Sequence, residues 1–525
     1  MIDTIATLQG KLSGVDTNDG KAFLGVPYAA APIGELRWRP PHPPKNWQGT
    51  KAADRYSDVA MQFLPAPNSL YYPGSPPQSE DCLTLNIWTN AHNRSERRPV
   101  MVWFHLGAFM FGSSACTTHP EGKRLFDGSE LAKLGVVVVT VNYRLGRFGF
   151  LAHPDLSAES DHKASGNYGF MDQVAALEWV RDNIAEFGGD PENVTIFGVS
   201  AGSASCSLHM ASPLSRGLFH RAIAGSGGFM GASGRTSGVF DKLLDLSSAE
   251  QRGKQVSDAL NVKNLNELRA LPAEAIMTAP IPTDAGLWHM ESIDAHIGDG
   301  ASDTSYPIVD GYALPASPAA ILRAGEHNDV PLLTGSTLDD CSGLPSIGKL
   351  SAFHEYLETD MGPLAAEAKQ VYPATDDATA SRASGNLLAD RVFGWQNWTW
   401  ANLARKHGTS PVFYYDWQHA PPLPASRFIE TRTGANHAAE MPYIFRNLSA
   451  YDWAWSAQDT EMSEMISRYW TNFAKYGDPN GGELPLWPKL EERDGPAMQL
   501  TPDAAPATPS RRERFSLLDK YYGAA

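Results

Sequence analysis

The segment 198–202 (G-V-S-A-G) contains the residue best suited to do chemistry, Ser200. An apolar, mostly β-branched run at 194–197 precedes it and small residues follow it, so we expect a strand, a sharp turn and a helix. A serine on such a turn lies exposed at the carboxyl end of a sheet, where it can act as a nucleophile. A G-x-S-x-G also arises by chance in a chain with 46 glycines, so the motif needs this structural context.

The elements that would position this serine follow a strand–helix alternation. Short apolar runs at 100–105, 136–141, 331–335 and 412–417 predict strands, and the β-branched run at 136–141 is typical of a central strand covered on both faces. Apolar residues at helical spacing in 167–187 predict an amphipathic helix just before the serine strand. Together these patterns predict an α/β fold with a large, mostly parallel twisted sheet flanked by helices.

Composition limits the class of protein. The chain has 525 residues, 42% of them apolar, and no repeat or long linker, so we expect one domain over 1–525 with helical or loop excursions at about 240–300 and 340–405. The net charge of −16 argues against a nucleic-acid partner, and no window is apolar for long enough to span a membrane. The N-terminus lacks a signal peptide, which predicts a cytoplasmic protein, or a secreted or periplasmic one whose leader was removed.

Several ordered motifs across nearly the whole chain resemble the type B carboxylesterases, the cholinesterase-like branch of the α/β-hydrolase fold. They are 23–29 (F-L-G-V-P-Y-A), 79–86 (S-E-D-C-L-T-L-N), 142–144 (N-Y-R) with 149–151 (G-F-L), 166–167 (G-N) to 172–173 (D-Q), 187–191 (F-G-G-D-P), 434–437 (G-A-N-H) with 442–445 (P-Y-I-F), and Trp470, Phe473 and 477–479 (G-D-P).

The resemblance implies a catalytic triad of Ser200, Asp340 and His437, in the chain order that this fold uses. The histidine would accept the serine proton, and the carboxylate would hold the imidazole in the right tautomer. The family usually has glutamate at the acid position, whereas this chain has two successive aspartates. Register from Gly335 favours Asp340 over Asp339, whose alternative role is a solvated or capping carboxylate. Taken alone, His437 could be an ordinary loop histidine.

The resemblance also implies an oxyanion hole from the backbone N–H groups of Gly107, Ala108 and Ala201. Leu106 stands where the family usually has glycine, and we expect it to narrow the space beside the scissile group. Ser226 matches a family serine that supports the histidine network, although a packing role is equally compatible with the sequence.

Three departures from the family pattern bear on substrate and compartment. Val199 replaces a glutamate that helps many members bind cationic alcohols, and no tryptophan lies between Trp47 and Trp88 to stack on choline. Met61 stands where the family's first disulfide would have the partner of Cys82, which favours a non-oxidising compartment or a bacterial member.

The expected function is therefore a serine carboxylesterase that hydrolyses neutral or anionic small-molecule esters through an acyl-enzyme, without metal or cofactor. One alternative is a specialised family hydrolase of a toxin, plasticiser or polyester, or an amidase. A non-catalytic adhesion domain is disfavoured, because such domains generally lose a triad member and this chain has all three.

Overall fold

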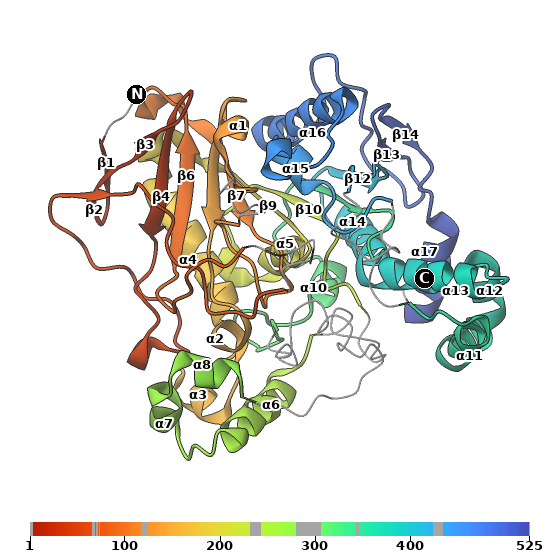
Figure 1. Ribbon diagram of the computed structural model, residues 1–525, viewed down its shortest axis with the longest axis horizontal. Helices are drawn as coiled ribbons and strands as arrows, with labels where there is room; N and C mark the ends of the chain where they lie inside the picture. The colour runs from red at the N-terminus through yellow and green to blue at the C-terminus, as the bar shows by residue number, and fades with distance from the viewer. Residues whose placement is uncertain are drawn as a thin grey trace.

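A computed structural model describes residues 4–65, 69, 72, 74–116, 124–231, 243–279, 306–342, 346–423 and 434–523. Over this part of the chain an 11-stranded sheet forms the centre of the molecule (Figure 1). In sheet order its strands are β14 (Ala505–Ala507), β13 (Ala497–Leu500), β12 (Val412–Trp417), β11 (Leu332–Thr337), β10 (Arg221–Gly225), β9 (Gly189–Val199), β7 (Arg98–Phe104), β8 (Val137–Val141), β6 (Thr84–Thr89), β4 (Lys21–Pro27) and β3 (Val15–Asp16).

The strands from β13 to β8 in this order run parallel, and antiparallel strands form both edges. The predicted mostly parallel sheet is thus confirmed. A separate small sheet at the N-terminus consists of β1 (Thr4–Thr7), β2 (Gly10–Ser13) and β5 (Thr50–Ala52).

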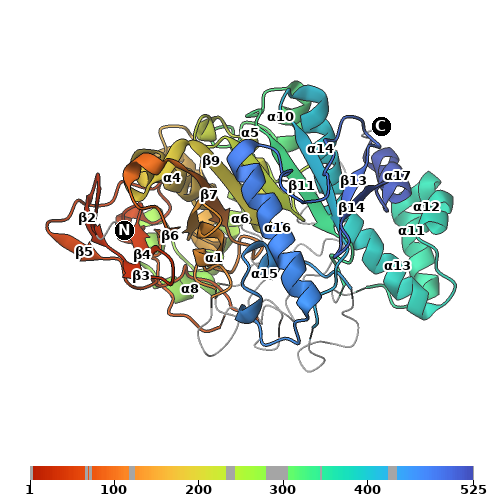
Figure 2. The same cartoon turned by 90° about the horizontal axis from the view of Figure 1, so that it is seen from above.

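Two layers of helices cover the sheet (Figure 2). One face carries α4 (Tyr168–Asn183), α5 (Ala201–Ala211), α10 (Pro318–Ala324) and α14 (Trp395–His407), and the other carries α1 (Ser129–Ala132), α15 (Met441–Ile444) and α16 (Ala457–Tyr476). An apolar core lies between the sheet and each helix layer, and the side chains of β8 alternate between the two cores. Val137, Val139 and Val141 face the first layer, whereas Val138 faces the second.

Helical excursions occupy the two predicted regions, as far as the structure describes them. The first holds α6 (Leu246–Ala259), α7 (Leu265–Ala270) and α8 (Ala273–Met277), and residues 280–305 lie outside the described part. The second holds α11 (Leu350–Met361), α12 (Ala365–Val371), α13 (Asp377–Ala389) and the π-helix Asp390–Gly394, which continues into α14. Whether the chain forms a single domain stays a prediction. None of the described helices is long and apolar enough to cross a membrane.

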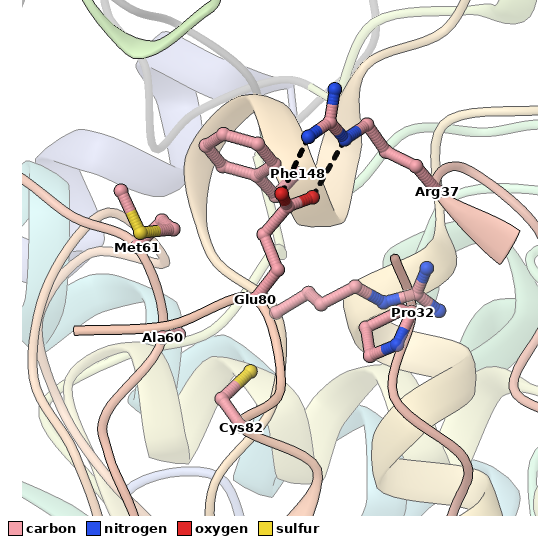
Figure 3. Close-up of a pocket in the computed structure, with 8 residues that line it drawn as sticks. Pro32, Arg37, Ala60, Met61, Glu80, Cys82 and Phe148 are labelled. Carbon is pink, nitrogen blue, oxygen red and sulfur yellow. Dashed lines mark hydrogen bonds and ion pairs between the residues drawn. The ribbon is translucent and has the colours of Figure 1, made fainter. Parts of the chain in front are cut away.

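Arg37, which lines a small pocket with Glu80 (Figure 3), also bonds to the first excursion. The guanidinium of Arg37 donates two hydrogen bonds to the Glu80 carboxylate at 2.7 and 2.5 Å, and Nη1 donates to the carbonyls of Arg269 and Leu271 at 2.9 and 2.8 Å. Met61 and Cys82 line the same pocket, and the Cys82 thiol is free, in line with the missing disulfide.

The carboxyl ends of the central strands set the position of the site. Gly225 at the end of β10 pairs with Val199 at the end of β9 and with Gly335 in β11. The residues that follow these strands, among them Ser200, Ser226 and Asp340, therefore emerge at one edge of the sheet, where open α/β sheets bind their ligands.

Candidate active site

Ser200 forms the turn between β9 and α5, as the sequence predicts. Its φ of 59° and ψ of −121° lie in a region that L-residues rarely adopt, which is typical of a nucleophile held on a strained turn. Its N–H donates to the Gly225 carbonyl at 2.9 Å, and its carbonyl accepts from the N–H of Ala204 at 2.8 Å. These bonds fix the turn at the start of the helix.

The two glycines of the motif are required by close backbone contacts. A Cβ atom on Gly198 would collide with the backbone of Gly202, and a Cβ on Gly202 would collide with the carbonyl oxygen of Phe104. Strand β7, the turn and helix α5 can therefore pack this tightly only with glycine at both positions.

His437 and Asp340 meet at this edge of the sheet. Nδ1 of His437 lies 2.7 Å from Oδ1 of Asp340, and the Asp340 side chain is fully buried. An ionised Asp340 would hold the proton on Nδ1 and leave Nε2 as an acceptor, which is the tautomer that a general base for serine needs.

Ser226 contacts the same carboxylate. Its hydroxyl donates to Oδ2 of Asp340 at 2.9 Å and accepts from the N–H of Thr337 at 3.1 Å. Its φ of 51° shows that the backbone is also held in the left-handed region. Ser226 thus reaches His437 only through the Asp340 carboxylate, and its support of the histidine network stays a prediction.

Asp339 points elsewhere. Its Oδ2 accepts from the N–H of Ala435 at 2.8 Å, and its own N–H donates to the Ala435 carbonyl at 3.0 Å. Burial raises the pKa of its carboxyl. A Cβ atom on Gly434 would collide with this carboxylate, so the glycine lets Asp339 hold the loop that precedes His437.

The predicted oxyanion turn has an unusual backbone. Gly107, Ala108 and Phe109 all have positive φ, at 120°, 52° and 59°. The Gly107 carbonyl accepts from the N–H groups of Met110 and Phe111 at 2.8 and 2.9 Å, which closes the turn. Non-glycine residues in this region store strain that is often found at functional sites.

The oxyanion role of the N–H groups of Gly107, Ala108 and Ala201 stays a prediction. No hydrogen bond within the described part of the chain uses the N–H of Gly107 or Ala108. Ala201 is the first residue of α5, so its N–H has no partner inside that helix. The leucine at 106 is 8% exposed and packs in the apolar cluster that contains Val199 and Ala438, so its effect on the substrate space stays a prediction.

His105, just before this turn, has a structural role. Its ring stacks on that of Tyr143 with centroids 4.4 Å apart, and Nδ1 lies 2.8 Å from the Leu106 carbonyl. Burial lowers the pKa of His105 to about 4, so this histidine is neutral at physiological pH and holds the turn without adding charge.

Glu440 is a buried residue near the site that the sequence reasoning missed. Neither of its carboxylate oxygens has a hydrogen-bond partner among the described residues, and Oε1 lies 2.8 Å from where a Cβ on Gly225 would be. Burial, and secondly the charge of Asp340, raise the pKa of Glu440 to about 8. The sequence feature that could have identified Glu440 is its position as the single acidic residue in the apolar stretch 438–445.

Replacing Glu440 by glutamine tests this protonation state. Below about pH 4.5 the carboxyl is protonated in both the folded and the unfolded chain. Between about pH 4.5 and about 8 only the folded chain keeps the proton, so the free energy of unfolding of the unchanged enzyme falls as pH rises. Glutamine cannot ionise, so the melting temperature of Glu440→Gln relative to the unchanged enzyme is expected to rise by roughly a few degrees between pH 5 and 9. A pH-independent difference in calorimetry would show that Glu440 is already charged at pH 5.

Comparisons with known proteins identify the family of the chain. The sequence model of the Carboxylesterase family matches residues 2–517. The chain is 34% identical to a fumonisin B1 esterase of Sphingopyxis macrogoltabida, with 93% of this chain and 84% of the relative covered, and 31% identical to the human cocaine esterase, with 94% and 85% covered.

Solved structures give the same result. A PNB esterase superposes with a TM-score of 0.79 at 29% identity, covering 98% of this chain and 99% of the other. A carboxylesterase of Geobacillus stearothermophilus gives 0.76 at 31% identity, with 98% and 99% covered. The fold is therefore the α/β-hydrolase fold, and the chain belongs to the Carboxylesterase family of carboxylic ester hydrolases.

Proposed function

We propose that this enzyme hydrolyses neutral or anionic carboxylic esters through an acyl-enzyme on Ser200, with His437 as general base and Asp340 as the carboxylate that orients it. The observation that carries the proposal is the hydrogen-bonded series Ser226–Asp340–His437 at the sheet edge where Ser200 forms the nucleophile turn. Asp340 has both oxygens occupied, so its position relative to the imidazole is fixed.

The proposed reaction has two halves. His437 Nε2 takes the proton of Ser200 as Oγ attacks the ester carbonyl, and the imidazolium then protonates the departing alcohol. Water repeats the attack on the acyl-enzyme and releases the acid. In both halves the negative charge on the former carbonyl oxygen would be stabilised by the N–H groups of Gly107, Ala108 and Ala201, which the strained turn and the helix start hold in place beforehand.

A pre-steady-state burst tests this function. With a chromogenic p-nitrophenyl ester, we expect a burst of p-nitrophenol equal to the enzyme concentration, and mass spectrometry of the quenched enzyme should find the acyl group on the peptide that contains Ser200. A linear time course with no acylated peptide at any substrate concentration, across short and long acyl chains, would contradict an accumulating acyl-enzyme. The same series of acyl and alcohol lengths identifies the preferred ester.

The alcohol side of the substrate is expected to be uncharged or negative. Val199 is 1% exposed, and its Cγ2 lies 3.5 Å from where a Cβ on Gly225 would be. The carboxyl near the same point, that of Glu440, keeps its proton below about pH 8. Neither residue therefore offers an anion to a cationic alcohol at neutral pH.

We accordingly expect no marked preference for choline esters. A desolvated cation–π contact is worth about 2 kcal/mol, a factor of about thirty in affinity, and the segment 48–87 has no tryptophan to supply it. Tyr71 and Tyr72 are the candidates in this segment for a substitute aromatic face. Tyr71 lies outside the described residues, and the Tyr72 hydroxyl pairs with that of Ser75 at 2.5 Å. The measurement is kcat/KM at moderate salt for butyrylcholine and its neutral isostere 3,3-dimethylbutyl butyrate. A tenfold preference for butyrylcholine would disprove the expectation.

A further inference from the structure

A π-helix presents an aromatic ring to the proposed general base. The π-helix Asp390–Gly394 joins α13 to α14, and π-helical turns often occur at functional sites. The ring of its Phe393 stacks on the imidazole of His437, with centroids 4.2 Å apart and planes 25° from parallel. Phe393 is 6% exposed and belongs to a small buried apolar cluster that includes Cys341, the residue after Asp340.

Buried charges hold the first residue of the π-helix. Oδ2 of Asp390 accepts hydrogen bonds from the Tyr372 hydroxyl at 2.9 Å and from Arg514 at 3.1 Å, and Arg511 lies 3.8 Å from Oδ1. Arg514 lies in α17 (Arg512–Tyr522), and Arg511 is the residue just before this helix. Helix α17 is at the blue end of the chain in Figure 1. The C-terminal helix is thus bonded directly to the π-helix.

The second residue of the π-helix, Arg391, also bonds to helix α17. Arg391 donates to Asp360 at 2.8 Å and to the hydroxyls of Tyr521 and Tyr522 at 3.2 and 3.3 Å. A buried charge that is paired and hydrogen-bonded in this way has a fixed geometry, because any rearrangement would leave it uncompensated.

The start of α14 contacts the nucleophile side of the site. Oδ1 of Asn397 accepts from the N–H of Gly227 at 2.8 Å, and its Nδ2 donates to the Thr334 hydroxyl at 2.8 Å. A Cβ atom on Gly227 would collide with the carbonyl oxygen of Ser200. One continuous segment therefore reaches both the His437 ring and the backbone that packs on Ser200.

We propose that Phe393 is a positioning residue for His437, and that helix α17, through Asp390, holds Phe393 in place. The proposal rests on the proposed function, since it assigns His437 the proton transfers. A stacked ring restricts rotation of the imidazole about its side-chain bonds and keeps both nitrogens aligned. An aromatic face also attracts a cation, so it stabilises the imidazolium that forms as Ser200 attacks.

The test compares four variants with a small neutral p-nitrophenyl ester. Phe393→Leu keeps most of the volume and removes the ring, so kcat is expected to fall by between about twofold and about thirtyfold with KM changed by less than about twofold. Phe393→Tyr keeps the ring and is expected to restore kcat to within about twofold. Arg514→Gln is expected to lower kcat less than Phe393→Leu does. Its matched control on the same helix, Arg512→Gln, removes an ion pair with Asp494, which lies outside the helix, and is expected to leave kcat unchanged.

Each outcome separates positioning from other roles. Unchanged kcat in Phe393→Leu, a loss expressed only in KM, or equal losses in the leucine and tyrosine variants with unchanged melting temperatures would overturn the role of Phe393. Equal kcat in the Arg514 and Arg512 variants would overturn the role of α17. The Ser200→Ala variant is assayed in parallel: if it keeps activity, the proposed function itself fails, whereas an inactive Ser200→Ala beside a fully active Phe393→Leu defeats this inference alone.

Discussion

Ser200→Ala is expected to lower kcat for ester hydrolysis by about 10,000-fold or more without unfolding the enzyme. Removal of a serine nucleophile leaves only the contribution of the oxyanion donors and of substrate binding, which is why the loss in comparable triads is so large. Alanine fits the site because the strain at this position, φ of 59°, is set by the backbone contacts of the glycines at 198 and 202.

The control for this prediction is Ser207→Ala. Ser207 lies on the same helix α5, is fully buried, and donates to the Ala204 carbonyl at 2.7 Å, so its loss tests the effect of removing a hydroxyl from that helix. We expect it to keep at least about half of the wild-type kcat, because it contacts none of the proposed catalytic groups in the part of the chain that the structure describes. If Ser200→Ala keeps a tenth of the wild-type rate, Ser200 is not the nucleophile.

The sequence indicated the serine turn and the parallel sheet because both depend on local patterns. The apolar run at 194–197 and the small residues after Ser200 determine a strand and a helix over a few residues, and β8 with its five buried positions is equally local. Strand lengths were less accessible, since β9 begins at Gly189, five residues before the apolar run. Gly189 pairs with Arg98 of β7, and the pairing is irregular between there and Val194, so this start depends on a long-range contact.

Features that depend on distant contacts could not be predicted from the sequence. Phe393 is one aromatic residue in a helical region, and nothing local places it on a histidine 44 positions later. Glu440 departs from the apolar pattern around it, but its proximity to Asp340 and its lack of a described partner follow from tertiary packing. The segment after Glu492 has no clear local pattern of its own, because β13 and α17 are ordered by their contacts with β12 and the buried charges of the π-helix.

The two adjacent aspartates allow the sharpest test of the site. Asp340→Asn is expected to lower kcat by about 10,000-fold, since an asparagine amide facing Nδ1 favours the wrong tautomer of His437 while leaving the geometry intact. Asp339→Asn is its matched control: the side chain keeps a carbonyl oxygen that can accept from the Ala435 N–H, so we expect a loss of less than about tenfold. Both variants make the same chemical change, a carboxyl to an amide, at adjacent positions, so the comparison isolates the position of the side chain. The measurement is kcat for one neutral ester at a pH where the unchanged enzyme is fully active. If Asp339→Asn loses more activity than Asp340→Asn, Asp339 is the carboxylate that acts on His437 in solution. The hydrogen bond between Asp340 and Nδ1 then does not orient the base.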